Sequence, residues 1–430
     1  VLPRFASLYS RGITDGATLT AHTRGASLSA TGSAFALLRS DGRVVTWGDS
    51  DRGGDSSIVM EKLFAVHSLT ATAFGAFAAV KTDGSVVTWG NPAYGGSSDS
   101  VRARLTGVKQ ITASAGAFAA LRADSSVVTW GHKCFGGDSR AVRGQLKDVQ
   151  QIWSTACRCL AMHCAAFAAL RRDGTVVTWG CAAYGGDSHA VQAQLRSVQQ
   201  IEATVGAFAA QREDGSVITW GHRAFGGDSG SVQHLLKDVR QVRATLGAFA
   251  GLCADGSVVS WGLEMISGND LPLDVLQNVK EIRVVDSVAL FAAVRQDDSV
   301  VIWGDRAFGQ HTYVAQADLD CLQELQVASK GAVATVLVDG SVKMRGLPDY
   351  GGDGSLVRDK LKNVQHIRAT AGAFAAICAD GTVVAWGSPA HGGDCSAVEG
   401  RLHEDSQLPR PGLRHALCKR RRLRYKQPSL

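Results

Sequence analysis

One eight-residue motif returns along almost the whole chain, and Asp83-Gly-Ser-Val-Val-Thr-Trp-Gly90 is its clearest copy. The tryptophan position recurs nine times, at intervals of 41 or 42 residues apart from one interval of 49, and Arg345 occupies it in one copy. The other eight copies hold Trp47, Trp89, Trp130, Trp179, Trp220, Trp261, Trp303 and Trp386. An aspartate stands six residues before this position in all nine copies, and glycine follows the aspartate in seven. A chain built this way folds as an array of similar units.

Each copy of the motif predicts a β-hairpin. Asp-Gly between two apolar runs favours a tight turn, because these residues tolerate the positive φ that such a turn needs. The first arm is the alanine-rich run before the turn, 116–122 in one unit, and the second is the Val-Val-Thr-Trp run after it. Both arms are apolar on both faces, which is typical of a sheet covered by neighbours on two sides. The repeated tryptophan is therefore predicted to be a core residue rather than an aromatic recognition residue.

Two further segments complete the predicted unit. A third strand precedes the hairpin, as at 108–113, and its small residues suit a crowded inner position. The loop after the tryptophan, 136–146 in one unit, contains Gly-Gly-Asp-Ser and then Val142 and Leu146, four positions apart. Asp or Ser accepts hydrogen bonds from the first N–H groups of a helix, so the loop predicts one short capped helix. Such a unit cannot bury both faces of its sheet alone, and stacked copies would form a propeller or a solenoid.

Composition limits the compartment and the partners. The 430 residues contain no apolar run near the roughly 18 residues that span a bilayer, so no membrane role is expected. Ten cysteines do not recur at the repeat period, which favours a reducing compartment, cytoplasmic or nuclear, over a secreted disulfide framework. The net charge is +6, but residues 406–430 hold eight Lys or Arg and no acid, so the body carries about 6 − 8 = −2. The chain begins with Val1, and whether it is a fragment stays open.

The sequence Asp-Gly-x-Val-x-x-Trp-Gly after an alanine-rich strand resembles the regulator-of-chromosome-condensation repeat, whose units form β-propeller blades. The period is shorter than is usual in that family and is similar to that of the three-stranded blades of the secreted bacterial propeller that inhibits β-lactamases. The resemblance covers about residues 25–400 and implies an all-β, propeller-like array of nine three-stranded units, each with a short helical loop. Propellers of this family usually have about seven blades, so blade number and ring closure stay open.

We predict three regions. Residues 1–24 form an irregular N-terminal segment, residues 25–405 form the repeat β-propeller, and residues 406–430 form a basic, disordered tail. The tail contains a cluster of cations suited to a nuclear import signal or a nucleic-acid-binding arm, or else it is simply a solvated end. Its members are Lys419, Arg420, Arg421, Arg422 and Arg424.

A second repeated position, five residues after the tryptophan, is aromatic in most units. Its aromatic members are Tyr94, Phe135, Tyr184, Phe225, Phe308 and Tyr350, and the other units have Arg52, Ile266 and His391. These residues are predicted to lie in loops at one rim of the array. Two hypotheses follow, namely that they contact a protein partner, or that they pack beneath the short helices. They are the candidate partner-binding residues.

Other motifs in the loops are weaker candidates. One aspartate per Gly-Gly-Asp-Ser loop supplies neither the converging carboxylates of a calcium site nor a phosphate-binding loop, so capping is preferred. Gly227-Asp-Ser-Gly230 imitates the nucleophile motif of trypsin-like proteases, but the chain lacks the surroundings of that family. No catalytic residue and no small-molecule substrate are therefore predicted.

The long interval of 49 residues reflects an eight-residue insertion within the nine-residue segment Ala156-Cys-Arg-Cys-Leu-Ala-Met-His-Cys164. Cys157, Cys159, His163 and Cys164 are possible metal ligands, but their spacing differs from that of structural zinc sites. A rim loop or an error in the gene model is the preferred interpretation. No metal and no cofactor are predicted.

The favoured function is a non-enzymatic scaffold that binds a protein partner through rim loops. Each unit presents a loop of the same frame with different residues, which is how a repeat array builds a broad, specific surface. The resemblance implies, more finely, regulation of a small GTPase or substrate recognition for a ubiquitin ligase. Two alternatives stay open: association with chromatin or nucleic acid through the basic tail, and inhibition of an enzyme, after the β-lactamase-inhibiting propeller.

Overall fold

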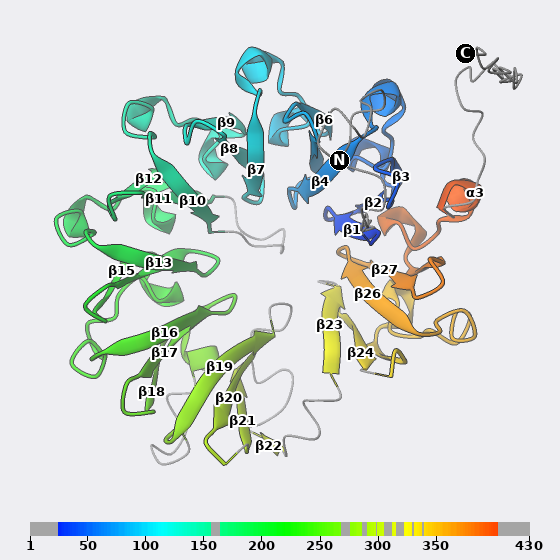
Figure 1. Cartoon of the computed structure of the whole chain (residues 1–430). Helices are drawn as coiled ribbons and strands as arrows, with labels where there is room; N and C mark the ends of the chain where they lie inside the picture. Colours follow the sequence, from blue (N-terminus) through cyan, green and yellow to red (C-terminus); the bar gives the residue numbers. More distant parts are fainter. Residues whose placement is uncertain are drawn as a thin grey trace, which may run out of the picture.

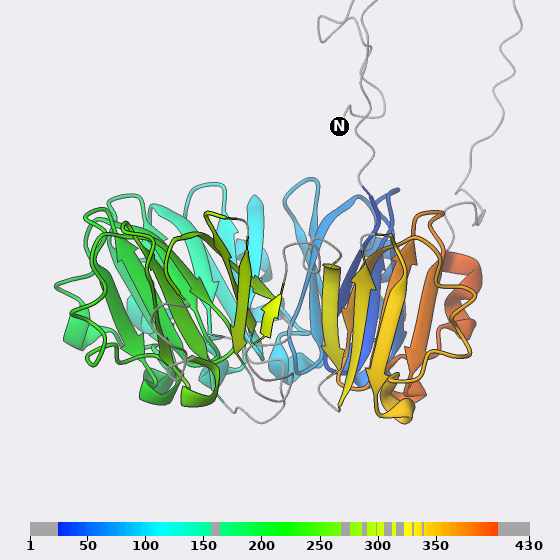
Figure 2. The same ribbon diagram turned by 90° about the horizontal axis from the view of Figure 1, so that it is seen from below.

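The computed structural model of the chain describes residues 25–155, 164–267, 276–285, 290–297, 299–304, 312–314, 322–328, 331–337 and 339–402. These residues form nine antiparallel sheets, one from each copy of the repeat. Figure 1 shows the sheets arranged around a ring, and Figure 2 shows their strands running between the two faces of that ring. The predicted all-β, propeller-like array of nine units is confirmed. The proposed segments 1–24 and 406–430 lie outside the described residues.

Each unit has an innermost, a middle and an outermost strand in chain order. The innermost strands are β1 (Ser27–Ala30), β4 (Val66–Ala71), β7 (Val108–Ala113), β10 (Val149–Ser154), β13 (Val198–Ala203), β16 (Val239–Ala244), β19 (Val279–Val285), β23 (Leu322–Ala328) and β26 (Val364–Ala369). The middle strands are β2 (Ala34–Leu38), β5 (Ala76–Lys81), β8 (Ala117–Arg122), β11 (Ala166–Arg171), β14 (Ala207–Arg212), β17 (Ala248–Cys253), β20 (Leu290–Arg295), β24 (Ala332–Leu337) and β27 (Ala373–Cys378). The outermost strands are β3 (Val44–Gly48), β6 (Val86–Gly90), β9 (Val127–Gly131), β12 (Val176–Gly180), β15 (Val217–Gly221), β18 (Val258–Gly262), β21 (Val300–Gly304), β25 (Val342–Gly346) and β28 (Val383–Gly387).

The predicted hairpin joins the middle strand to the outermost strand. Its aspartate accepts hydrogen bonds from the residue two positions later; Asp83 Oδ1, for example, lies 2.9 Å from the Ser85 nitrogen and 2.6 Å from its Oγ. Gly84 between them has a φ of +77°. These contacts fix the register in which the repeated phenylalanine of the middle strand faces the repeated tryptophan, as Phe118 faces Trp130. The Asp-Gly motif therefore performs the turn role that the sequence indicates.

The hydrophobic core lies between units rather than within one. The repeated tryptophans are only 1–5% exposed, and each stacks on the phenylalanine of its own unit with ring centroids 5.1–5.4 Å apart. In seven units the indole Nε1 also donates to a glycine carbonyl of the preceding unit, at 3.0–3.2 Å. The predicted core role of tryptophan is confirmed, and the indole N–H joins neighbouring units.

The first and last units are neighbours in the ring. Trp47 Nε1 donates to the carbonyl of Gly392 at 3.1 Å, which is the same contact that joins consecutive units. A hydrophobic cluster shared by these two units includes Leu28, Phe35 and Leu402, and the first and last sheets lie side by side in Figure 1. The N- and C-terminal units of the described chain therefore meet at a seam with ordinary unit-to-unit packing.

The seventh and eighth units depart from the repeat. The sequence did not predict the short strand β22 (Thr312–Val314), which adds a fourth strand to the seventh sheet. In the eighth unit Arg345 replaces the tryptophan and is exposed, as is Lys343, whereas the equivalent residues of other units are buried or half-buried. Among the described residues, hydrophobic clusters bridge every neighbouring pair of units except these two. The most degenerate copy of the motif thus lies at the boundary that no hydrophobic cluster of described residues bridges.

The loops after the outermost strands contain short helices, most of them 3-10 turns rather than the α-helices that capping motifs suggest. Turns at the end of the outermost strand are η2 (Ser50–Arg52), η4 (Pro92–Tyr94), η6 (Lys133–Phe135), η8 (Ala182–Tyr184), η10 (Arg223–Phe225), η12 (Pro348–Tyr350) and η13 (Pro389–His391). Helices further along the loops are η3 (Ser57–Lys62), η5 (Asp99–Arg104), η7 (Arg140–Val142), η9 (His189–Val191), η14 (Ser396–Val398) and α3 (Glu399–Leu402), and α1 (Glu264–Ser267) lies in the sixth unit.

In the Gly-Gly-Asp-Ser loops only the aspartate takes the predicted capping role. The aspartate does accept from the backbone, as Asp138 Oδ1 does from the Arg140 nitrogen at 3.0 Å. The serine does not cap: it is buried and bonds to the threonine of the outermost strand, as Ser139 does to Thr129 at 2.9 Å. Ser229 of the protease-like motif does the same with Thr219 at 2.9 Å, so its hydroxyl has a structural role.

Two glycines of the third unit, Gly131 and Gly144, allow a matched test of how closely the backbone segments approach each other. Gly131 follows the tryptophan with a φ of +103°, and a Cβ there would lie 2.7 Å from the Cα of Ala117. A Cβ at Gly144 would meet nothing within 4 Å. We expect Gly131→Ala to lower the free energy of unfolding by about 2–5 kcal/mol through backbone strain and overpacking. Gly144→Ala should stabilise the fold by up to about 1 kcal/mol. Urea denaturation of both variants checks this; equal midpoints would contradict it.

Candidate functional site

The seven 3-10 turns that follow the outermost strands share one backbone conformation, and we call the side of the ring that carries them the rim face. The residue before each turn has φ between −60° and −74° and ψ between 116° and 132°. The glycine after each turn has φ between +86° and +103°. The side chains differ from unit to unit, for instance Asn91-Pro-Ala-Tyr94 and His132-Lys-Cys-Phe135. The rim face is therefore a constant backbone frame with variable side chains.

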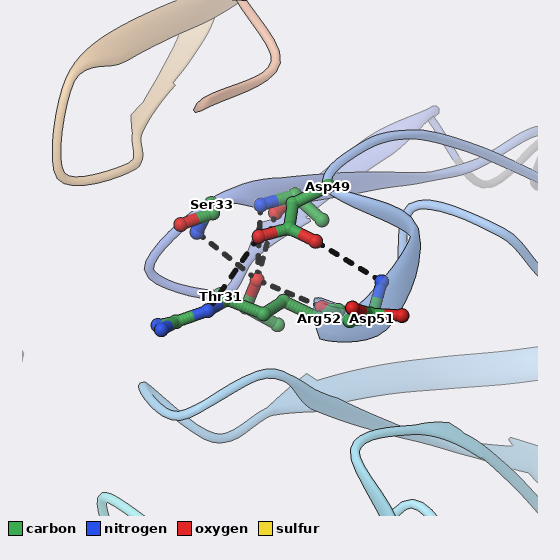
Figure 3. A network of polar contacts seen from close by, with 6 residues as sticks. Thr31, Ser33, Asp49, Asp51 and Arg52 are labelled. Carbon is green, nitrogen blue, oxygen red and sulfur yellow. Dashed lines mark hydrogen bonds and ion pairs between the residues drawn. The ribbon is translucent and has the colours of Figure 1, made fainter. Parts of the chain in front are cut away.

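Buried hydroxyl groups hold these turns to the sheets. Figure 3 shows the first unit, where Thr31 Oγ1 lies 3.2 Å from the carbonyl of Arg52 and accepts from the Ser33 nitrogen at 3.3 Å. Asp49 accepts from the Asp51 nitrogen at 3.0 Å and forms an ion pair with Arg52 at 3.5 Å. The same hydroxyl-to-carbonyl bond recurs from Ser114, Thr204 and Thr370 to the carbonyls of Phe135, Phe225 and His391, at 2.7–2.9 Å. A Thr or Ser recurs at this position in the sequence, so this feature was available to sequence analysis but was missed.

The predicted aromatic residues of the rim come together in pairs from adjacent units. Tyr94 and Phe135 have ring centroids 6.1 Å apart, edge to face. Gly116 lies between them, because a Cβ at this glycine would be 2.8 Å from atoms of both rings. Tyr184 and Phe225 flank Gly206 in the same way, again at 2.8 Å. The glycine at the start of the middle strand thus admits two rim aromatics.

Histidines and a phenylalanine that the sequence analysis did not select extend these pairs. His132 lies 5.7 Å from Tyr94 and 5.5 Å from Phe135, centroid to centroid. His222 repeats the arrangement between Tyr184 at 5.5 Å and Phe225 at 5.1 Å. Phe74 adds a ring stacked on Tyr94 at 4.9 Å. Two three-ring groups with a central histidine therefore lie on the rim face, one across the second and third units and one across the fourth and fifth.

The candidate partner-binding residues differ in accessibility. Tyr94, Tyr184, Phe225 and Tyr350 are half-buried, so each offers part of its ring to solvent. Phe135 is only 4% exposed, packed against Phe74 and Tyr94. Its contacts match the hypothesis of packing in the rim rather than that of partner contact. Phe308 and the tail cluster at 419–424 lie outside the described residues, and the part in partner binding of all of these residues stays a prediction.

Three cysteines gather between the two three-ring groups. The thiol of Cys164 lies near those of Cys181 and Cys134. Burial, first, and these two thiols raise the pKa of Cys164 to about 11. Among the described residues, no group of three or more His, Cys, Asp or Glu side chains is arranged to hold a metal ion. Cys157, Cys159 and His163 of the insertion lie outside that part of the chain.

The hairpin aspartates face away from the rim face. The hydroxyl and then the backbone N–H of Ser85 hold the pKa of Asp83 below its ordinary value, and Ser216 acts in the same way on Asp214. A lowered pKa keeps the carboxylate charged and accepting, so these groups serve as turn acceptors near neutral pH. Their contribution to stability is present above the ordinary pKa of Asp and is lost as the pH falls through the lowered folded-state value.

The innermost strands β1, β4, β7 and β26 line a central hollow of about 500 Å³. Its lining is rich in hydroxyl groups and includes Arg368. The hydroxyls bond across unit boundaries: Ser29 Oγ lies 3.4 Å from the carbonyl of Leu69, and Thr70 Oγ1 lies 3.3 Å from that of Ile111. These hydroxyl groups of the hollow therefore help to join successive units.

Comparison with known proteins finds likeness in structure alone. No protein-family model matches the sequence, and no curated protein sequence matches it. Solved structures that are similar include Prp20p from Saccharomyces cerevisiae, described with its binding to Gsp1p and histones, with a TM-score of 0.34, 16% identity, and coverage of 53% of this chain and 71% of that one. The ectodomain of the Physcomitrella patens receptor kinase CR4 has a TM-score of 0.36 and 16% identity, and the match covers 63% of this chain and 70% of that one. The C-terminal domain of gp131 from bacteriophage phiKZ has a TM-score of 0.33 and 10% identity, with coverage of 86% and 92%.

These values carry no argument about activity or partners. No helix among the described residues is long and apolar enough to cross a membrane. The repeated motif and the nine sheets of the chain itself determine its fold, which is a repeat β-propeller with mostly three-stranded units, similar to those of the regulator-of-chromosome-condensation type.

Proposed function

We propose that this chain is a non-enzymatic scaffold that binds a protein partner through the rim face. The observation that carries the proposal is the constant frame of the seven rim turns, on which each unit places different side chains. A rigid frame loses little conformational entropy on binding, and variation on it gives specificity without chemistry.

The side chains of the second to fifth units suit this role. The half-buried rings of Tyr94 and Tyr184 stack on Phe74 and His222, respectively. These side chains therefore lose little conformational entropy when a partner binds. Exposed Lys133 and Arg223 lie in the rim turns of the units that follow, η6 and η10. The Arg223 side chain is 88% exposed although it pairs with Asp228 at 3.3 Å. Aromatic anchors beside cations are typical of the energetically dominant residues of protein interfaces. A partner with an acidic surface is therefore favoured.

The finer assignment rests on the sequence resemblance. Regulation of a small GTPase and substrate recognition for a ubiquitin ligase are both roles of regulator-of-chromosome-condensation-like propellers, and both would use one face of the ring. The second candidate function is association with chromatin or nucleic acid. The eight basic residues and absence of acids in 406–430 favour it, because such a segment binds phosphate groups without reading sequence.

The test compares binding by rim variants. The full chain and a chain ending at residue 405 would be used in nuclease-treated pull-downs from cells of the source, and bound proteins quantified by mass spectrometry. We expect one protein to be retained by both chains at similar stoichiometry. The double variant Tyr94→Ala, Tyr184→Ala should weaken its binding about 30-fold or more, the size expected for two aromatic anchors. Lys133→Glu with Arg223→Glu should also weaken it.

The matched control is Glu213→Lys, an exposed residue beside the Asp-Gly turn on the opposite face. It reverses a charge without touching the rim face and should leave binding unchanged. Phe135 is unsuitable as a test residue because its burial makes a loss of folding the expected result. Equal loss from Glu213→Lys and the rim variants would refute rim recognition. Retention by the full chain only, abolished by nuclease, would establish the nucleic-acid function instead.

A further inference from the structure

The thiols of Cys134, Cys164 and Cys181 are brought together by the fold rather than by the repeat. Cys164 precedes the middle strand β11, Cys181 precedes the rim turn η8, and Cys134 lies inside the rim turn η6 of the preceding unit. These are three different positions of the repeat, in two units. Their convergence is therefore particular to the boundary between the third and fourth units.

Backbone hydrogen bonds hold the three segments together. The Ala165 nitrogen donates to the carbonyl of Cys134 at 3.1 Å, and the Cys181 nitrogen donates to the carbonyl of Ala165 at 2.9 Å. Ala165 stands where the neighbouring boundaries have Gly116 and Gly206. Those glycines separate pairs of rim aromatics, whereas this boundary places cysteines beside the alanine. The proximity of Cys164 and Cys181 thus rests on the backbone hydrogen bond between Ala165 and Cys181.

All three cysteines are reduced and half-buried, so a small reagent has access to them. The backbone hydrogen bonds of Ala165 place the Cys164 and Cys181 segments side by side, which suits a disulfide because that bond tolerates little backbone movement. We propose that Cys164 and Cys181 form an intramolecular disulfide by exchange with a low-molecular-weight disulfide such as oxidised glutathione, with Cys134 as the adjacent third thiol.

The exchange balances with glutathione as the oxidant. The Cys181 thiolate attacks one sulfur of oxidised glutathione, an S–S bond of glutathione breaks, and one glutathione thiolate leaves. Cys164 then attacks the Cys181 sulfur of the mixed disulfide, the second glutathione leaves, and the Cys164 proton passes to it. Two protein thiols are oxidised, and one oxidised glutathione becomes two reduced molecules. The pKa of Cys164 is raised to about 11, so this thiol keeps its proton near neutral pH until the second step.

The experiment uses the full reduced chain in a series of glutathione redox buffers, followed by alkylation, trypsin and mass spectrometry. Cleavage at Arg158, Arg171 and Arg172 places Cys181 alone in one peptide, 173–196, and Cys164 with Cys159 in another, 159–171. We expect a disulfide between these two peptides that rises as the buffer becomes more oxidising. Cys164→Ser and Cys181→Ser should each reduce it more than about tenfold, while Cys159→Ser and Cys134→Ser leave it in place.

The variants separate this pairing from its competitors. Persistence of the linked peptides in Cys164→Ser would assign the bond to Cys159 of the insertion and overturn the proposal. A link from Cys181 to the Cys134 peptide, 134–140, would also overturn it. So would full alkylation of Cys181 in wild-type protein at every buffer ratio. Fragment-ion spectra of the linked wild-type peptides distinguish Cys164 from Cys159 as the bonded residue, so the test does not depend on the folding of any variant.

Discussion

Replacing Trp179 by alanine is expected to lower the free energy of unfolding by about 3–5 kcal/mol, the usual range for removing a buried tryptophan. Trp179 is 4% exposed, and its ring stacks on Phe167 with centroids 5.2 Å apart. Its Nε1 donates to the carbonyl of Gly136 in the preceding unit at 3.0 Å. The substitution would leave a cavity between two units and a buried carbonyl without its donor. Urea denaturation followed by circular dichroism measures the change.

Arg345 supplies the matched control, because it occupies the tryptophan position of the eighth unit and is exposed. Arg345→Ala should change stability by no more than about 0.5 kcal/mol, as is usual for surface substitutions. Trp179→Phe separates the contribution of the buried ring from that of the hydrogen bond, because it keeps an aromatic ring but removes the N–H donor. We expect it to lower the free energy of unfolding by about 1–3 kcal/mol. If Trp179→Ala and Arg345→Ala gave the same midpoint, the repeated tryptophan would not be what holds the units together.

The repeat was sufficient to predict the units of this fold. Asp-Gly turns, apolar arms and the spacing of the tryptophan are local signals, and the strands they predict are present in each described copy. The burial of tryptophan was predictable for the same reason, since a residue that recurs in an apolar strand must face another sheet. What the sequence could not indicate was the direction of the indole N–H, because its acceptor belongs to the preceding unit, about 35 residues earlier in the usual case.

The rim was harder to predict because its contacts join different units. Tyr94 and Phe135 are separated by 41 positions, and the glycine between them, Gly116, belongs to an unrelated part of the motif. The aromatic pattern indicated residues in the rim turns, such as Tyr94 and Phe135, but not that Phe135 is buried against Phe74. Cysteine spacing was likewise uninformative, because Cys134, Cys164 and Cys181 meet only after two units stack. β22 was missed because nothing in the repeat provides for a fourth strand.

Degeneracy in the sequence does carry structural information. The eighth copy has Arg345 for tryptophan and Val333 for phenylalanine, and Arg345 and Lys343 are exposed. Its other face, with Ala332, Ala334 and Val336 fully buried, packs on the ninth unit as the repeat requires. A degenerate motif in the eighth unit therefore weakens its boundary with the seventh unit without affecting its boundary with the ninth. This is expected for an array in which each unit contacts only its neighbours.

The seam between the last and first units is expected to be essential for stability. A chain ending at residue 387 would lack Gly392, whose carbonyl accepts from Trp47 Nε1 at 3.1 Å, and Arg401, whose carbonyl accepts from Arg39 Nη1 at 3.0 Å. It would also lack Leu402, 2% exposed in the cluster around Phe35. Losing this burial and leaving the Trp47 donor unsatisfied should cost at least about 4 kcal/mol.

The matched control is a chain ending at residue 402, which removes the basic tail but keeps every described contact of the seam. It should unfold at the same urea concentration as the full chain. Hydrogen exchange adds a local measurement, since amides of β1, β2 and β3 should lose protection in the shorter chain while those of β13, β14 and β15 on the far side of the ring keep theirs. Equal stability of the two truncated chains would mean that the terminal units do not support each other. Loss of protection in both would mean that the tail, rather than the seam, stabilises the first unit.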